Sequence, residues 1–200
     1  MEFDWDGVPL IISRTGWSSE LGYEIFLRDG TQGEKLWEHL MAVGGPLGLK
    51  PGHTSSIRRI EAGMLSYHAD MTLANNPYEM GMGRLVDLNM EADFISKAAL
   101  TLIKERGVSQ QLVGLEIDGD PFVGSNDFFW PVLEEGVKVG TVTSAIYSPR
   151  LQKNIALAMI SIDHTASGRV LQVDKLSETR ACTVVPIPFY DPKKSLATAS

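Results

Sequence analysis

The spacing of hydrophobic and polar residues near the start of the chain predicts two short strands. The pair Asp6-Gly7 has the composition of a turn, and an apolar run over residues 8–12 follows it directly. A second strand-like run covers residues 22–27, where successive side chains alternate in character as they do on the two faces of a sheet. The chain therefore opens with two predicted strands separated by a loop.

A helix is predicted after these strands. Thr31 and Glu34 have the spacing of a capping box, in which each side chain satisfies the backbone N–H of the other residue. Leu36, Leu40 and Val43 then fall on one side of the helix, and Gly44-Gly45-Pro46 is a strong stop signal.

Two further helices flank a long irregular stretch. Helical spacing of apolar residues predicts a helix over 54–64, beginning at Thr54. Residues 67–87 are rich in Asn, Gly, Met and Pro, and such long loops in compact domains are often functional. The last helix is predicted over 93–106, with Gly107 as its stop and three inward-facing residues: Ala99, Leu102 and Ile103.

From about Leu112 onward the pattern becomes that of strands. Glu135-Gly136 reads as a hairpin turn between two of them. Regularly spaced short strands are typical of a small antiparallel barrel or sandwich. The six runs are residues 112–117, 130–133, 137–144, 155–162, 170–176 and 181–187. An α+β first part and an all-β second part are thus expected, joined by the 93–106 helix.

The first part, taken alone, has few predicted strands for an independent domain. Three or more strands covered by a helix layer are usually needed for independent stability, and the pattern supplies two. We therefore expect upstream sequence to supply further strands, the alternative being a short domain completed by dimerisation. An apolar face left uncovered in this way also predicts self-association.

Composition and charge exclude several classes of function. The 200 residues are 44% hydrophobic and 22% charged, and the net charge of −7 argues against a nucleic-acid partner, which needs a basic face. No apolar run approaches the roughly 20 residues that span a bilayer. A single cysteine, Cys182, allows no internal disulfide, and the N-terminal residues are acidic where a signal peptide is basic. The expected compartment is the cytoplasm, without a membrane partner.

The common catalytic signatures are missing from the sequence, and two segments remain as candidates for binding. The four histidines are scattered singly, so no metal site is predicted. In residues 14–24, Trp17 offers a flat face to a planar ligand and Glu24 can accept paired N–H donors. The alternative is a hairpin with Trp17 packed on the core and Glu24 solvated. In residues 58–64, Arg59 suits a carboxylate or a ring acceptor, or else forms an ion pair on or between helices.

Three ordered motifs resemble the glycine-cleavage T-protein family. The first is residues 14–24, which begin with R-T-G and an aromatic residue and end with a glutamate. The second is residues 58–64, which contain R-x-E-A-G, and the third is residues 148–156, which contain S-P-x-L and N-I-A. The resemblance covers nearly the whole chain and implies three domains arranged around tetrahydrofolate. It divides this chain into a partial ferredoxin-like α+β folate-binding core at 1–92, a connecting helix at 93–110 and a C-terminal antiparallel β-barrel at 111–200.

The resemblance also implies roles for the candidate residues. Glu24 corresponds to the glutamate that hydrogen-bonds the pterin, Trp17 to the aromatic residue lining the same pocket, and Arg59 to an arginine near the ligand. The family's N-terminal half carries the aspartate placed near the reacting N5 of folate. No residue of this chain is assigned a catalytic role, since that half is not in the sequence.

The function implied is that of the C-terminal half of a tetrahydrofolate-dependent methyltransferase. Residues 66–71 and 75–81 resemble the branch that demethylates dimethylsulfoniopropionate by methyl transfer to N5. One alternative is the aminomethyl transfer of glycine cleavage. Another is a non-catalytic folate-binding relative or an interaction module. The expected partner is a small-molecule one-carbon donor.

Overall fold

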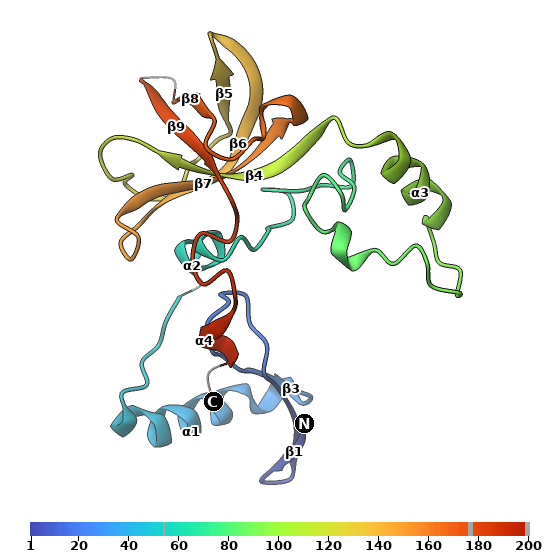
Figure 1. Ribbon diagram of the computed structural model, residues 1–200. Helices are drawn as coiled ribbons and strands as arrows, with labels where there is room; N and C mark the ends of the chain where they lie inside the picture. The colour runs from blue at the N-terminus through green and yellow to red at the C-terminus, as the bar shows by residue number, and fades with distance from the viewer. Residues whose placement is uncertain (54, 176–177, 199–200) are drawn as a thin grey trace. The chain divides into compact units, whose positions relative to one another are not determined.

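The computed structural model describes residues 1–53, 55–175 and 178–198, which belong to two compact units. The first unit contains Met1–Ser55 together with Lys194–Ser200, and the second contains Ser56–Lys193. Each unit has its own strands and helices (Figure 1). The division into 1–92, 93–110 and 111–200 expected from the sequence stays a prediction.

The first unit is built on a three-stranded antiparallel sheet in the order β1-β2-β3. Its strands are β1 (Glu2–Trp5), β2 (Val8–Ser13) and β3 (Glu24–Leu27). The two predicted strands are confirmed, whereas β1 is an additional one that precedes the Asp6-Gly7 turn. Both turn residues have positive φ, 53° and 82°, which suits a tight connection between antiparallel strands. The ring of Trp5 then packs against His39 at 5.4 Å between centroids, joining β1 to the helix that follows.

That helix, α1 (Gly33–Gly44), begins differently from the prediction. The Thr31–Glu34 capping box is wrong, because no side chain caps α1 at its N-cap residue, Gln32. Asp29 instead caps the turn before the helix: it accepts from the backbone N–H of Thr31 at 3.0 Å and from its hydroxyl at 2.7 Å. A short 3-10 turn, η1 (Gly30–Gln32), leads into the helix, and a second, η2 (Gly45–Leu47), follows it. Leu36 is buried as expected, but Val43 is 59% exposed. The last helix of the unit is α4 (Ser195–Thr198).

The second unit is dominated by a closed six-stranded antiparallel barrel in the order β4-β7-β6-β5-β8-β9 (Figure 1). The fold is therefore α+β with a C-terminal barrel, as the sequence predicts. The strands are β4 (Gln110–Ile117), β5 (Trp130–Glu134), β6 (Val137–Ser148), β7 (Lys153–Ser161), β8 (Val170–Asp174) and β9 (Thr179–Val185). Ile162, predicted to end a strand, instead opens η4 (Ile162–His164), and Leu176 lies outside the described residues.

Alternation along these strands creates the barrel core. Side chains from all six strands meet inside it, among them Leu115, Val132 and Val142, which have no exposed surface. Glu135 and Gly136, with φ of 51° and 79°, make the predicted turn between β5 and β6. Because the sheet is closed, none of its strands is left with an open edge.

A short helix, α2 (Ser56–Glu61), lies against the barrel strands β6 and β7 (Figure 1). Ile60 is 1% exposed and packs in a second apolar cluster with Ile155 and Leu157 of β7. The helix is shorter than the predicted 54–64, and its expected first residue, Thr54, lies outside the described residues. The stretch after it is irregular, as predicted, apart from η3 (Gly83–Leu85).

The connecting helix α3 (Lys97–Arg106) differs most from expectation. It begins at Lys97 rather than near Asp93, and none of its residues is buried. The prediction that Ala99, Leu102 and Ile103 face a core is therefore wrong, and Leu102 is 49% exposed. Gly107 ends the helix as predicted, with φ of 78°. No described helix is long and apolar enough to cross a membrane.

Cys182 gives a direct test of the barrel core. It is 1% exposed on β9, and burial raises the pKa of its thiol to about 12, because the apolar surroundings disfavour the thiolate. We expect an aromatic disulfide reagent to leave Cys182 unmodified at pH 8 in the native chain and to modify it fully in urea. Modification of the native chain at the unfolded rate would show that the barrel does not enclose this strand.

Candidate functional site

Trp17 and Glu24 belong to the first unit, on the loop between β2 and β3 and at the first residue of β3. Glu24 lies opposite Ser13 in the strand pairing, and its carboxylate accepts a hydrogen bond from the hydroxyl of Thr15. Glu24 is exposed, and Trp17 is 46% exposed. The motif therefore presents an oriented carboxylate and an indole surface that solvent can reach, and Trp17 is not packed away in a core.

Arg59 lies in the second unit, on α2, and it is buried. Its Nη1 is 2.8 Å from Oδ2 of Asp70, and the side chains of these two residues are 9% and 0% exposed. Its Nη2 donates to the hydroxyl of Ser144 on β6 at 2.8 Å. An ion pair is thus present, as one interpretation of the sequence allowed, but its partner is in the irregular segment rather than on a helix.

Asp70 is the centre of this buried network. One of its carboxylate oxygens accepts from the hydroxyls of Thr143 and Ser144, at 2.7 and 2.6 Å. The other accepts from Arg59 and from the backbone N–H of Ser66 at 2.9 Å. A buried carboxylate is tolerated only when it is paired and hydrogen-bonded in this way. The network fixes α2 and the segment after it to strand β6.

Glu61 connects the helical motif to the third motif. It is 2% exposed, and its Oε1 accepts from the hydroxyl of Ser148 at 2.6 Å. Nη1 of Arg150 lies 3.6 Å from its Oε2, and the Arg150 guanidinium also lies 4.0 Å from the centre of the Tyr190 ring. The carbonyl oxygen of Glu61 accepts from the backbone N–H groups of Phe189 and Tyr190. Both motifs therefore hold the C-terminal segment against α2.

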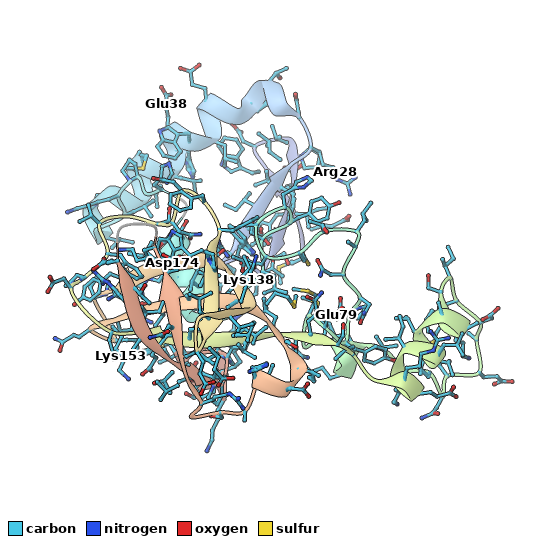
Figure 2. All side chains as sticks on the ribbon, turned by 90° about the horizontal axis from the view of Figure 1, so that it is seen from above. Arg28, Glu38, Glu79, Lys138, Lys153 and Asp174 are labelled. Carbon is cyan, nitrogen blue, oxygen red and sulfur yellow. The ribbon has the colours of Figure 1, made fainter. Side chains whose placement is uncertain are left out.

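The irregular segment is organised by a side-chain cap of its own. Asn76 Oδ1 accepts from the backbone N–H of Glu79 at 3.1 Å, while Glu79 Oε2 accepts from that of Asn76 at 3.1 Å. This is a capping box around a single turn. The carbonyl of Glu79 also accepts from the backbone N–H of Leu112, which ties the turn to β4 (Figure 2).

The prediction from the sequence did not identify four interacting residues: Asp70, Ser144, Glu61 and Ser148. Ser148 and Glu61 stand in the recognised motifs, so a signal was present, but nothing in the spacing pairs them across 87 positions. Trp17 and Glu24 lie in one unit and Arg59 in the other. The expectation that all three surround one folate pocket stays a prediction. Within the described residues, no three acidic, histidine or cysteine side chains are grouped to hold a metal ion.

The order of a small sheet with a helix followed by a closed barrel, together with the three motifs, defines the class of protein. The GCVT N-terminal domain matches residues 1–90, and the glycine cleavage T-protein C-terminal barrel domain matches residues 110–191. The chain belongs to the glycine-cleavage T-protein family.

Two relatives with different names match most of this chain. The dimethylsulfoniopropionate demethylase DmdA of Ruegeria pomeroyi is 38% identical over 180 residues, which are 90% of this chain and 48% of that protein. An aminomethyltransferase of Bacillus mycoides is 37% identical over 192 residues, 94% of this chain and 51% of that protein.

A solved structure shares the fold. The glycine cleavage system aminomethyltransferase T of Bartonella henselae superposes with a TM-score of 0.76 at 20% identity, over 90% of this chain and 49% of that one. The chain thus spans about half the length of the relatives that it matches. This fits the expectation of a C-terminal half, since the barrel domain is included.

Proposed function

We propose that this chain is the C-terminal half of a tetrahydrofolate-dependent methyltransferase that demethylates dimethylsulfoniopropionate. The observation that carries the proposal is the 38% identity to the Ruegeria pomeroyi demethylase over 90% of the chain. The exposed carboxylate of Glu24 and the accessible indole of Trp17, which lie in the same sequence motif, support folate as the second substrate.

The residues of the first unit fit a reduced pterin. A carboxylate accepts two parallel N–H donors from a 2-amino-4-oxo ring, and Glu24 is exposed and oriented by the Thr15 hydroxyl for such a contact. An indole face as exposed as that of Trp17 can stack on the same planar ring. Arg59 fits less directly, because its guanidinium is already held by Asp70 and Ser144. Its proposed role is to position α2 rather than to touch the ligand.

When bound, tetrahydrofolate supplies the N5 nucleophile. The carbon–sulfur bond of the sulfonium breaks as the nitrogen–carbon bond forms; its electron pair stays on sulfur, giving a neutral thioether, and N5 loses a proton. This step needs little acid catalysis, because the leaving group is neutral. Protein side chains contribute mainly by holding the two reactants in line.

Aminomethyl transfer is the second candidate, and a specific observation favours it. The Bacillus mycoides aminomethyltransferase is 37% identical and matches slightly more of this chain, 94%. A third candidate is a folate-binding relative or interaction module without activity. Turnover with dimethylsulfoniopropionate, compared with release of an aminomethyl group from a lipoyl arm, distinguishes the three.

The proposed partners are a small one-carbon donor and a second polypeptide surface, either the remaining half or another copy. Exposed apolar side chains in the first unit support a second polypeptide surface. They include Phe26 on β3, which is 52% exposed, and Phe3 on β1, which is 50% exposed. β1 and β3 are also the edge strands of their sheet and can pair with another strand. The proposed compartment is the cytoplasm. The chain has a single cysteine and so no internal disulfide, which suits a compartment where thiols stay reduced.

Replacing Glu24 with Gln tests the folate contact. The amide keeps the size of the side chain but loses the charge and one of the two acceptor oxygens, so we expect folate affinity to fall by roughly 10- to 100-fold. Binding is measured from the quenching of tryptophan fluorescence by tetrahydrofolate under anaerobic conditions.

Glu38→Gln is the matched control, because it removes the same charge from an exposed position of α1 in the same unit (Figure 2). Its affinity should equal that of the unchanged chain. Equal weakening of both variants would assign the effect to overall charge and would contradict a direct role of Glu24.

A further inference from the structure

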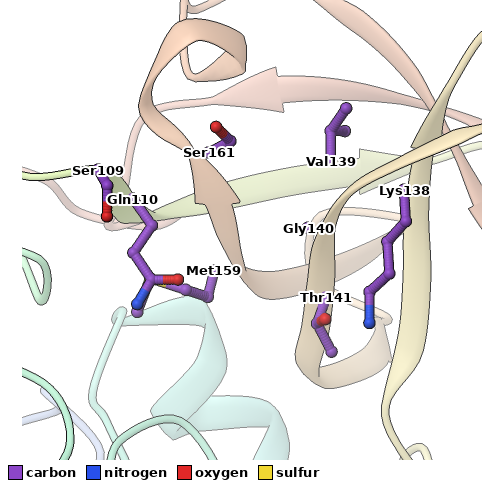
Figure 3. Close-up of a pocket in the computed structure, with 8 residues that line it drawn as sticks. All are labelled: Ser109, Gln110, Lys138, Val139, Gly140, Thr141, Met159 and Ser161. Carbon is purple, nitrogen blue, oxygen red and sulfur yellow. The ribbon is translucent and has the colours of Figure 1, made fainter.

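A hollow of about 460 Å³ lies on the barrel, outside the motifs described above. We call it the strand-end pocket, because it is formed where β4 and β6 begin and β7 ends (Figure 3). Its lining residues are Ser109, Gln110, Lys138, Val139, Gly140, Thr141, Met159 and Ser161. All eight belong to the second unit.

The strand-end pocket is rich in hydrogen-bond donors that the fold itself does not use. Within the described part of the chain, the hydroxyls of Ser109, Thr141 and Ser161 form no hydrogen bond, and the ammonium of Lys138 forms no ion pair. Gln110 is held in place, because its amide nitrogen donates to the buried carboxylate of Glu79 at 3.3 Å. Three hydroxyls and a cation therefore border one concave surface.

The charge around this pocket is unusual for the molecule. The chain carries a net charge of −7, yet none of the eight described lining residues is Asp or Glu. Lys138 is the one charged side chain among the eight described lining residues, so an anion that enters the hollow meets an ammonium and no carboxylate of the lining. By contrast, Lys153 at the other end of the β6–β7 pair is held by Glu116 at 2.6 Å.

The floor of the strand-end pocket is set by the close pairing of β6 and β7. Gly140 lies opposite Ile160, and a Cβ at position 140 would approach the carbonyl oxygen of Met159 to 2.6 Å. Only glycine allows the two backbones to lie this close.

We propose that the strand-end pocket binds a small oxyanion, a carboxylate or a phosphate group, through the Lys138 ammonium and the surrounding hydroxyls. Charge-assisted hydrogen bonds from an ammonium and from hydroxyl groups to such oxygens are the strong ones in proteins. The site is separate from Glu24 and Trp17, so the proposal does not depend on the folate function.

The test is a titration of the isotope-labelled full chain with inorganic phosphate, and separately with propionate, at constant ionic strength kept with chloride. We expect saturable shifts of the amide NMR signals of Lys138, Gly140, Thr141 and Ser161. The arm with the higher affinity identifies the oxyanion as phosphate or as carboxylate. Lys138→Gln should weaken that binding roughly five-fold, the size expected for one exposed ion pair.

Lys153→Gln is the control, because it removes the same charge from the opposite end of the same strand pair (Figure 2). Its affinity should stay unchanged, and Thr141→Val, which removes one hydroxyl at nearly constant volume, should weaken binding without altering the barrel spectrum. Shifts that never saturate with either anion would overturn the proposal. So would equal losses in the two lysine variants.

Discussion

The purified chain, assayed alone, should transfer methyl groups from dimethylsulfoniopropionate to tetrahydrofolate at least about 100-fold more slowly than a complex of the chain with the N-terminal half of a relative. The proposed reaction depends on holding two reactants in line, and a displacement of about 1 Å can cost roughly 100-fold in rate. The chain spans about half the length of the relatives that it matches, and under the proposed function the other half supplies the remaining residues of the site. The rate is measured as the formation of methyltetrahydrofolate over time, which chromatography detects.

The partner for this experiment is the part of the Ruegeria pomeroyi demethylase that this chain does not match, co-expressed with it. The same demethylase split at the corresponding position is the positive control, since it shows whether two separate halves can assemble. Full turnover by this chain alone would contradict the need for a second half. No gain from the partner, where the split control is active, would contradict the proposed methyl transfer.

The second large effect is expected at Asp70. Asp70→Ala should lower the free energy of unfolding of the second unit by about 3–5 kcal/mol, because it leaves the buried charge of Arg59 without its carboxylate. The hydroxyls of Thr143 and Ser144 and the N–H of Ser66 lose the same acceptor. The measurement is urea unfolding followed through the amide NMR signals of β6 and β7.

An exposed ion pair supplies the control for Asp70. Glu2 lies 3.2 Å from Arg28 with the two side chains 82% and 57% exposed, so Glu2→Gln should change stability by less than about 0.5 kcal/mol. The double replacement Arg59→Met with Asp70→Leu removes both buried charges and should cost less than Asp70→Ala. A small effect of Asp70→Ala itself would show that water reaches Arg59 in solution.

The barrel could be predicted from the sequence because its information is local. Side chains that alternate over five to twelve residues specify a strand, and Glu135-Gly136 specifies the turn between two of them. Strand β1 carries the same alternation, with Phe3 and Trp5 between acidic residues. It was missed because the strand has only four residues and its charged members lower the average hydropathy.

The interactions of the candidate site could be predicted only in part. The motifs locate Glu24, Trp17 and Arg59, but the residues that orient Arg59 are 11 and 85 positions away. Periodicity contains no information about such distant pairs, since they depend on how α2 settles on the barrel. The start of α1 failed for a related reason: Thr31 is the donor to Asp29 in the preceding turn, through both its N–H and its hydroxyl, and Asp caps at least as well as Thr.

Helix α3 has a consequence for how this protein can be altered. A ten-residue helix with no buried side chain has almost no tertiary support, and peptides of that length are marginally helical in water. Its backbone should therefore open often while the barrel stays closed. Proteases cut first at such places, and insertions are tolerated there. A reporter peptide or an affinity tag can therefore be placed in the 97–106 segment without disturbing β4 to β9.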